Sequence, residues 1–277
     1  MRTLRLKICL PLLLMSISVL AVAQSPRVVR ASGLSPAAQH KIVKDAQESY
    51  YSLRAVGLEE FQSTIKPNWE KILHDQGVTD SKDMQAALQL LNGLHFSMQL
   101  DENGKVTVNH HSDIEPPNER VKQGFDQINS GIEQAVSGFF ATWSLFMLNS
   151  PFPDAGSAFQ LEDQGSQYRL SYKEGDSDVV MLMSKHLVIS EIKVTSPQFL
   201  SIVKPQVRET PKGFVLTGYI GDYTPTSGPG VVHLDVKIEH APVNGMQLPL
   251  TLIADSTLDG APTHMELAFS EYQVKSH

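Results

Sequence analysis

From residue 158 almost to the C-terminus, apolar and polar residues alternate, and this pattern constrains the fold more than any other feature of the chain. Segment 231–240 is representative, because positions 232, 234, 236 and 238 are apolar and the residues between them are polar or charged. Such alternation predicts antiparallel strands with one face on a core and the other in water. Short segments rich in Gly, Asp, Asn and Pro separate them, as in hairpins. The predicted strands are 158–162, 167–173, 178–184, 187–195, 198–209, 213–222, 231–241, 247–257 and 263–275.

The N-terminal half mixes helical and extended patterns. Ser35 followed by Pro36 is typical of a helix start, since Ser caps the first turn and Pro fits its first position. Asn103-Gly104 between two alternating segments indicates a hairpin turn. The predicted elements are a helix from Ser35 with apolar spacing up to Gly57, an extended segment over 58–65, a helix from Asp80 or Ser81 to Gly93, and a hairpin over 95–111.

A long helix is predicted over 118–148, because apolar residues recur there with a period of about 3.6. A break near 129–131 is compatible with the pattern. Gly124, Gly131 and Gly138 recur every seven residues. Each costs about 1 kcal/mol relative to Ala in a helix, so we expect a neighbouring element or a ligand to approach the helix closely there. Together these patterns predict a single α+β domain over 35–277, with helices gathered on one face of a large antiparallel sheet.

The N-terminus has the features of a secretory signal peptide. Basic residues precede an apolar stretch over 8–22, and Ala21-Val22-Ala23 provides a small-x-small cleavage site. We therefore predict a signal peptide over 1–23, cleavage between Ala23 and Gln24, a flexible lead-in over 24–34, and a periplasmic or secreted protein. An uncleaved membrane anchor is the alternative. Cys9, the one cysteine of the chain, does not follow the cleavage site, so a lipid anchor on cysteine is not expected.

Charge and motifs exclude several functions. Without the three basic residues of the leader, the chain has 20 Lys and Arg and 30 Asp and Glu, so its net charge is negative. An acidic chain without a basic cluster is a poor partner for nucleic acid. We find no nucleophile elbow, zinc-protease, phosphate-loop or dinucleotide motif. We therefore predict no enzyme and no cofactor, although Ser, His and Asp from distant positions could still assemble.

The histidines receive no role at this stage. His110, His111 and Asp113 form the one cluster that resembles a metal site. Neighbouring residues of a strand point to opposite faces, so His110 and His111 cannot easily share one ion. We therefore predict no metal site. His233 and His240 lie on, or at the end of, a solvent-facing strand pattern and are given no function.

Three C-terminal segments have a distinctive sequence: GFVLTGYIGDY (213–223), VKIEHAPVNGMQLPLTLIADS (236–256) and MELAFSEYQV (265–274). Together with the order of elements over 35–275, they resemble the outer-membrane lipoprotein carrier superfamily, the Lol-type fold. The resemblance implies export to the periplasm and a curved antiparallel sheet, a half-barrel, with helices on its concave face. It also implies a lipid, an acyl chain or a lipidated protein as partner, and peripheral association with the cell envelope.

The apolar run SGFFATWSLFMLNSPFP (137–153) is the candidate binding region. Its continuous apolar-rich part, 138–148, is eleven residues long, whereas a membrane span needs about 20. The run therefore belongs to a helix that either lines a ligand cavity or fills the half-barrel itself. In the second case the protein is an envelope structural or interaction protein without a small ligand. The predicted lining residues are Phe139, Phe140, Trp143, Phe146, Met147, Gly131 and Gly138.

Overall fold

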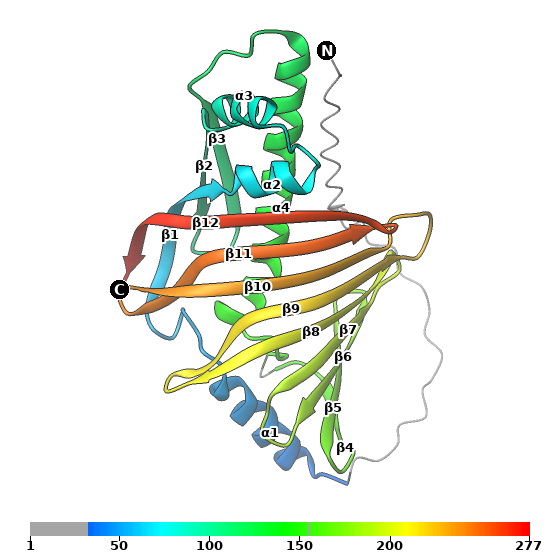
Figure 1. Cartoon of the computed structure of the whole chain (residues 1–277). Coiled ribbons are helices and arrows are strands. Elements are labelled where there is room, and N and C mark those ends of the chain that lie inside the picture. Colours follow the sequence, from blue (N-terminus) through cyan, green and yellow to red (C-terminus); the bar gives the residue numbers. More distant parts are fainter. Residues whose placement is uncertain (1–32, 155) are drawn as a thin grey trace.

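The computed structural model describes residues 33–154 and 156–277 (Figure 1). The predicted signal peptide and residues 24–32 of the predicted lead-in lie outside this range. The described residues form one large, unclosed, antiparallel sheet of twelve strands with four helices. The α+β class with a large antiparallel sheet is thus confirmed, and the unclosed sheet is consistent with a half-barrel.

The N-terminal half contains all four helices and three strands. Asn68, Asp80 and Asn118 cap α2, α3 and α4 by accepting hydrogen bonds from backbone N–H groups of the first turn. Ser35 caps α1 in the same way, as the sequence predicted. The elements are α1 (Pro36–Ser49), β1 (Leu58–Pro67), α2 (Trp69–Asp75), α3 (Ser81–Leu91), β2 (Leu94–Leu100), β3 (Val106–Ser112) and α4 (Glu119–Met147).

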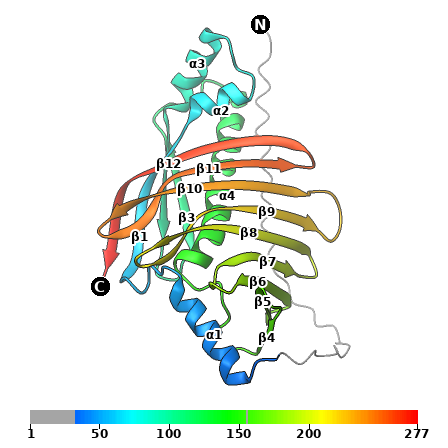
Figure 2. The ribbon, with the colours of Figure 1, turned by 60° about the horizontal axis from the view of Figure 1, so that its bottom comes forward.

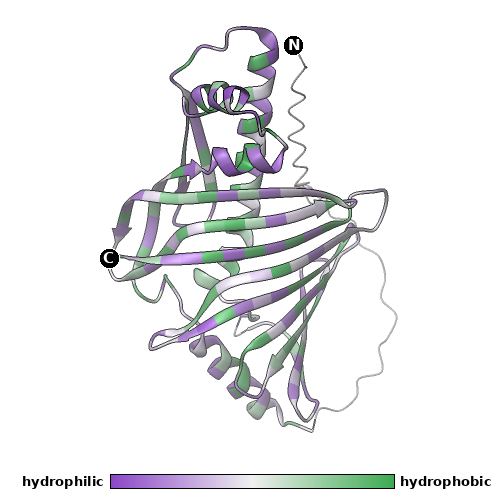
Figure 3. Cartoon of the chain, viewed as in Figure 1, coloured by the Kyte–Doolittle hydropathy of each residue, from purple (hydrophilic) through white to green (hydrophobic). Residues whose placement is uncertain are grey.

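The C-terminal half consists of nine strands. All nine predicted strands are confirmed, and their ends differ from the predicted ones by at most three residues. Hydrophobic and hydrophilic residues alternate along them (Figure 3). The strands are β4 (Phe159–Asp163), β5 (Gln167–Glu174), β6 (Ser177–Ser184), β7 (Ile189–Thr195), β8 (Phe199–Thr210), β9 (Gly213–Pro225), β10 (Val232–Val243), β11 (Met246–Leu258) and β12 (Ala261–Ser276).

The sheet order is β3-β2-β1-β12-β11-β10-β9-β8-β7-β6-β5-β4. Neighbouring strands are consecutive in the chain except β1 and β12, whose pairing joins the two halves of the chain. Of the consecutive pairs, β1 and β2 are connected through α2 and α3, and the others form hairpins. The edge strands are β3 and β4, and α4 connects them in the sequence. At the β4 edge, the backbone N–H of Leu161 donates to Oε1 of Gln39 on α1 at 3.0 Å. This contact satisfies a donor that an uncovered edge strand would expose.

Two local predictions were wrong. The first helix ends at Ser49 instead of continuing towards Gly57. At that point the N–H of Tyr51 donates to the carbonyl oxygen of Phe214 on β9 at 3.0 Å, so the backbone pairs with a strand rather than with the helix. The seven-residue helix α2 was not predicted, and its short length explains why.

Helix α4 is continuous over 29 residues, without the break considered near 129–131. It runs behind β9–β12 in two views and crosses these strands (Figures 1 and 2). Its aromatic rings pack against rings of the sheet. The ring centroids of Phe139 and Phe269 on β12 are 6.2 Å apart, and those of Phe140 and Phe61 on β1 are 6.0 Å apart. Within the described residues, no helix is both long and apolar enough to span a membrane.

Candidate functional site

A cavity of about 430 Å³ lies between α4 and strands β8–β12. Its volume falls within the range of roughly 300–1,000 Å³ that is typical of small-molecule sites. The lining residues are Ala135, Gly138, Phe139, Thr142, Ser201, Val203, Tyr219, Gly221, Asp222, Tyr223, Pro225, Ser227, Pro229, Gly230, Val232, Leu234, Val236, Leu252, Ala254, Ser256, Leu258, Asp259, Thr263 and Met265.

The helix contributes small residues to this wall. Ala135, Gly138, Phe139 and Thr142 are spaced by three, one and three residues, which puts them on one face of α4. Three of the four are Ala, Gly or Thr, whose short side chains leave space between the helix and the sheet. The cavity therefore lies where α4 presents its smaller side chains.

Strands β10 and β11 contribute every second residue. Positions 232, 234 and 236 of β10 and positions 252, 254, 256 and 258 of β11 line the cavity, so one face of each strand is turned towards it. Gly221 on β9 pairs with Leu234 on one side and Val203 on the other, both of which also line the cavity. Most of these side chains are apolar, so the sheet wall suits an apolar ligand.

One polar pair lies deep in the wall. Tyr219 is buried, and burial raises the pKa of its phenol to about 12, an effect that a hydrogen bond with Thr142 partly offsets. Both side chains line the cavity. Since the phenol stays protonated at neutral pH, this pair can offer a neutral hydrogen-bonding group to a ligand.

The cavity is bounded at one end by the loop between β9 and β10 and by the turn between β11 and β12. Asp259 in that turn accepts hydrogen bonds from the N–H groups of Gly230 at 3.0 Å and Val231 at 2.9 Å. Its own N–H donates to the carbonyl oxygen of Val231 at 2.8 Å. The loop and the turn are thus tied together, and Val231 beside them is half exposed.

The predicted lining residues divide into two groups. Gly138 and Phe139 line the cavity. Phe140, Trp143, Phe146, Met147 and Gly131 lie outside its lining and are buried. The large side chains at 140, 143, 146 and 147 therefore fill the space between helix and sheet, and the cavity lies beside the adjacent face of α4, which carries residues 135, 138, 139 and 142.

Trp143 is the largest fully buried side chain of the packed C-terminal end of α4. Its ring lies 5.3 Å from that of Phe140 and 6.3 Å from that of Phe61 on β1. Its indole N–H donates to Nε2 of His240 on β10 at 3.4 Å. His240, which the sequence pattern left without a role, is thus the polar partner of the tryptophan. Burial, and secondly the positive charge of Arg208, lower the pKa of His240 to about 4.

Acidification is expected to destabilise the protein through His240. The folded state favours the neutral imidazole, whereas the unfolded chain takes up a proton near pH 6.5. The stability that depends on the neutral form is therefore complete above pH 6.5 and is lost as the pH falls towards 4. Urea unfolding at pH 7.5 and pH 5 should reveal a smaller loss of unfolding free energy in His240→Gln than in the wild type. His186→Gln, at an exposed position, should behave like the wild type, and equal losses in all three proteins would contradict the assignment.

No protein-family model, curated protein or solved structure matches this chain.

Proposed function

We propose that this protein is an exported binding protein that holds a lipid, an acyl chain or the lipid part of a lipidated protein between α4 and the concave face of a half-barrel sheet. The observation that carries the proposal is the apolar cavity of about 430 Å³ beside α4. Concave, mainly apolar cavities with a few polar groups are the usual form of small-molecule sites.

The contacts of Trp143 support a concave sheet around α4. Its indole approaches Phe61 on β1 and also His240 on β10. These strands are separated by β12 and β11, which corresponds to about 14 Å in a flat sheet with strands about 4.8 Å apart. A single indole reaches both strands more readily when the sheet bends around the helix.

The lining favours a ligand that is neutral near the end of the cavity. Asp259 is an acidic lining residue at this end. An anionic head group beside its carboxylate would be repelled. A neutral acyl ester or an amide-linked acyl chain fits better than a free fatty acid. The predicted signal peptide and the resemblance to lipoprotein carriers favour a periplasmic site of action and peripheral contact with the envelope.

The packed end of α4 favours a second, structural role for the same helix. Phe140, Trp143, Phe146 and Met147 are all at most 1% exposed. This end acts as a permanent plug, as expected for a half-barrel filled by its own side chains. The two functions are compatible, because the packed residues and the cavity-lining residues lie on adjacent faces of the same stretch of α4.

Binding of a neutral apolar probe is the expected result that tests the proposal. The full chain, extracted with organic solvent to remove co-purified lipid, should bind N-phenyl-1-naphthylamine with an increase in fluorescence and at about one molecule per chain. A neutral monoacylglycerol should displace the probe more effectively than a fatty acid of the same length. Native mass spectrometry before extraction should detect a bound lipid-sized mass. A ligand-free protein that binds neither probe nor monoacylglycerol would contradict the proposal.

A further inference from the structure

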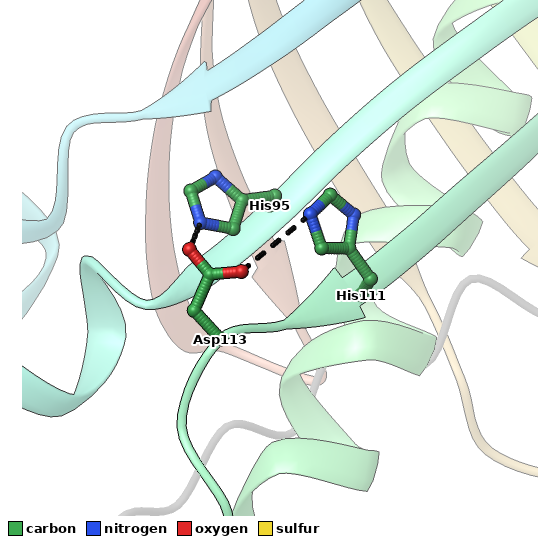
Figure 4. Close-up of side chains that lie close together, drawn as sticks. All are labelled: His95, His111 and Asp113. Carbon is green, nitrogen blue, oxygen red and sulfur yellow. Dashed lines mark hydrogen bonds and ion pairs between the residues drawn. The ribbon is translucent and has the colours of Figure 1, made fainter.

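The hairpin of β2 and β3 brings together two histidines that are far apart in the sequence. Its register pairs His95 directly with His111, next to the last pair at the open end of the hairpin. Their rings stack with centroids 4.7 Å apart and an interplanar angle of 20°. Directly opposed side chains of an antiparallel pair lie on the same face, so both imidazoles point to the same side (Figure 4).

A carboxylate from the loop after β3 lies against this pair. Asp113 Oδ2 lies 2.7 Å from His95 Nε2, and Asp113 Oδ1 lies 3.9 Å from His111 Nε2. The backbone fixes Asp113, because its N–H donates to the carbonyl oxygen of Gly93 at 2.9 Å. Ile114, the next residue, packs so closely on Gly93 that a Cβ there would lie 2.7 Å from its Cδ1.

We propose that His95, His111 and Asp113 form a binding site for a divalent transition-metal ion of the zinc class. One ligand atom from each residue lies within 4.8 Å of the others. In a tetrahedral zinc site with bonds of about 2.0–2.1 Å, ligand atoms lie about 3.3 Å apart. Small side-chain rotations bring the three atoms to that spacing without any change in the strands.

The chemistry of the three ligands selects the class of ion. Two imidazoles and one carboxylate suit Zn²⁺, Ni²⁺, Co²⁺ or Cu²⁺, whereas Mg²⁺ and Ca²⁺ prefer oxygen ligands alone. The side chains of His95, His111 and Asp113 are 44%, 72% and 66% exposed, so an ion can enter from solvent and keep water in a further position. An exposed ion pair adds little to stability, so stabilisation of the hairpin alone does not account for the cluster.

This cluster is separate from the ligand cavity. The cavity is lined by α4, β8–β12 and their connections, whereas the cluster lies at the open end of the hairpin at the β3 edge of the sheet. A bound ion would link β3 to β2 at this end. His110, the neighbour of His111, pairs with Phe96 instead, which puts it on the opposite face of the hairpin.

Calorimetric titration of the tag-free, chelator-treated full chain with Zn²⁺ tests the proposal. We expect saturable binding of about one ion per chain, an increase in melting temperature, and no binding of Mg²⁺. His95→Gln, His111→Gln and Asp113→Asn should each weaken Zn²⁺ binding by at least about tenfold, because each removes one of three ligands.

His110→Gln is the matched control, since it removes a histidine from the same strand but from the other face. It should leave the Zn²⁺ affinity within about twofold of the wild type. If His95→Gln binds Zn²⁺ as tightly as the wild type, or if His110→Gln weakens binding as much as His111→Gln, the ion is held elsewhere and the proposal is wrong. Binding of N-phenyl-1-naphthylamine should be unchanged in all four variants, so this test does not depend on the proposed lipid site.

Discussion

Replacing Trp143 with alanine is expected to lower the free energy of unfolding by about 3–5 kcal/mol, the range for removal of a large aromatic side chain from a packed core. Trp143 is fully buried and contacts rings on α4 and β1 as well as His240 on β10. Its loss leaves a cavity where the helix meets distant strands of the sheet, and it removes the hydrogen-bond donor to the partly buried imidazole of His240. Urea unfolding followed by far-ultraviolet circular dichroism measures the change.

Two further variants help to separate the loss of packing from the loss of the indole hydrogen bond as causes of the lower free energy of unfolding. Trp143→Phe keeps an aromatic ring but removes the indole N–H, so it should cost less than Trp143→Ala and more than a surface substitution. Leu250→Ala truncates an apolar side chain that is 42% exposed and should change the free energy of unfolding by no more than about 0.5 kcal/mol. If Trp143→Ala costs less than about 1 kcal/mol, this end of α4 does not hold the sheet together.

Alternation was sufficient to predict the C-terminal strands because most of them have one side that is more buried than the other. On β10, Val236 and Ile238 are buried while Lys237 and Glu239 are exposed. The hydropathy of successive residues therefore alternates along the strand together with their burial. The pairing of β1 with β12 is different. It joins residues about 200 positions apart, and no local pattern encodes such a contact.

The end of the first helix was mispredicted for a related reason. Tyr50 and Leu53 continue the helical spacing and are buried, as the pattern requires. They are buried in a non-helical segment that pairs with β9, where Gly213 approaches Tyr50 and Tyr51 so closely that a Cβ would lie 2.8–2.9 Å from their backbone. Tertiary pairing therefore overrides the local helical preference.

Side-chain size decided which of the predicted lining residues of α4 border the cavity. Most of the predicted lining residues are large and apolar, and of these large residues only Phe139 lines the cavity, because large side chains fill the space that they reach. Phe140, Trp143 and Phe146 are buried outside the cavity lining, whereas Ala135 and Thr142 border open space. The better signal for a cavity on α4 is the face that carries its small residues.

The histidine cluster could have been found from the hairpin alone. His95 and His111 are equidistant from Asn103, at the centre of the predicted turn. The prediction of no metal site considered His110, the neighbour of His111 along the strand, whereas the partner of His111 across the hairpin is His95. Cross-strand register brings residues together that spacing along one strand separates.

Replacing Gly221 with leucine is expected to weaken binding of N-phenyl-1-naphthylamine by at least about tenfold while the fold is retained. Gly221 lines the cavity, and a Cβ there would meet its nearest neighbours on Leu234 and Tyr219 at 3.8–3.9 Å, which is ordinary van der Waals contact. The leucine side chain would extend from this point into the space that the probe needs. Because glycine weakens a strand interior, the free energy of unfolding should stay the same or rise by up to about 1 kcal/mol.

The matched control is Ala268→Leu, which adds apolar volume at an exposed position of β12. It should leave the affinity for the probe unchanged, since its neighbours in the chain, Leu267 and Phe269, are the residues that are buried. Equal probe affinity in Gly221→Leu and in the wild type would mean that the cavity does not hold the ligand. Loss of binding together with loss of stability would point to damaged packing, whereas loss of binding at full stability requires that the probe and the new side chain compete for the same space between α4 and β9.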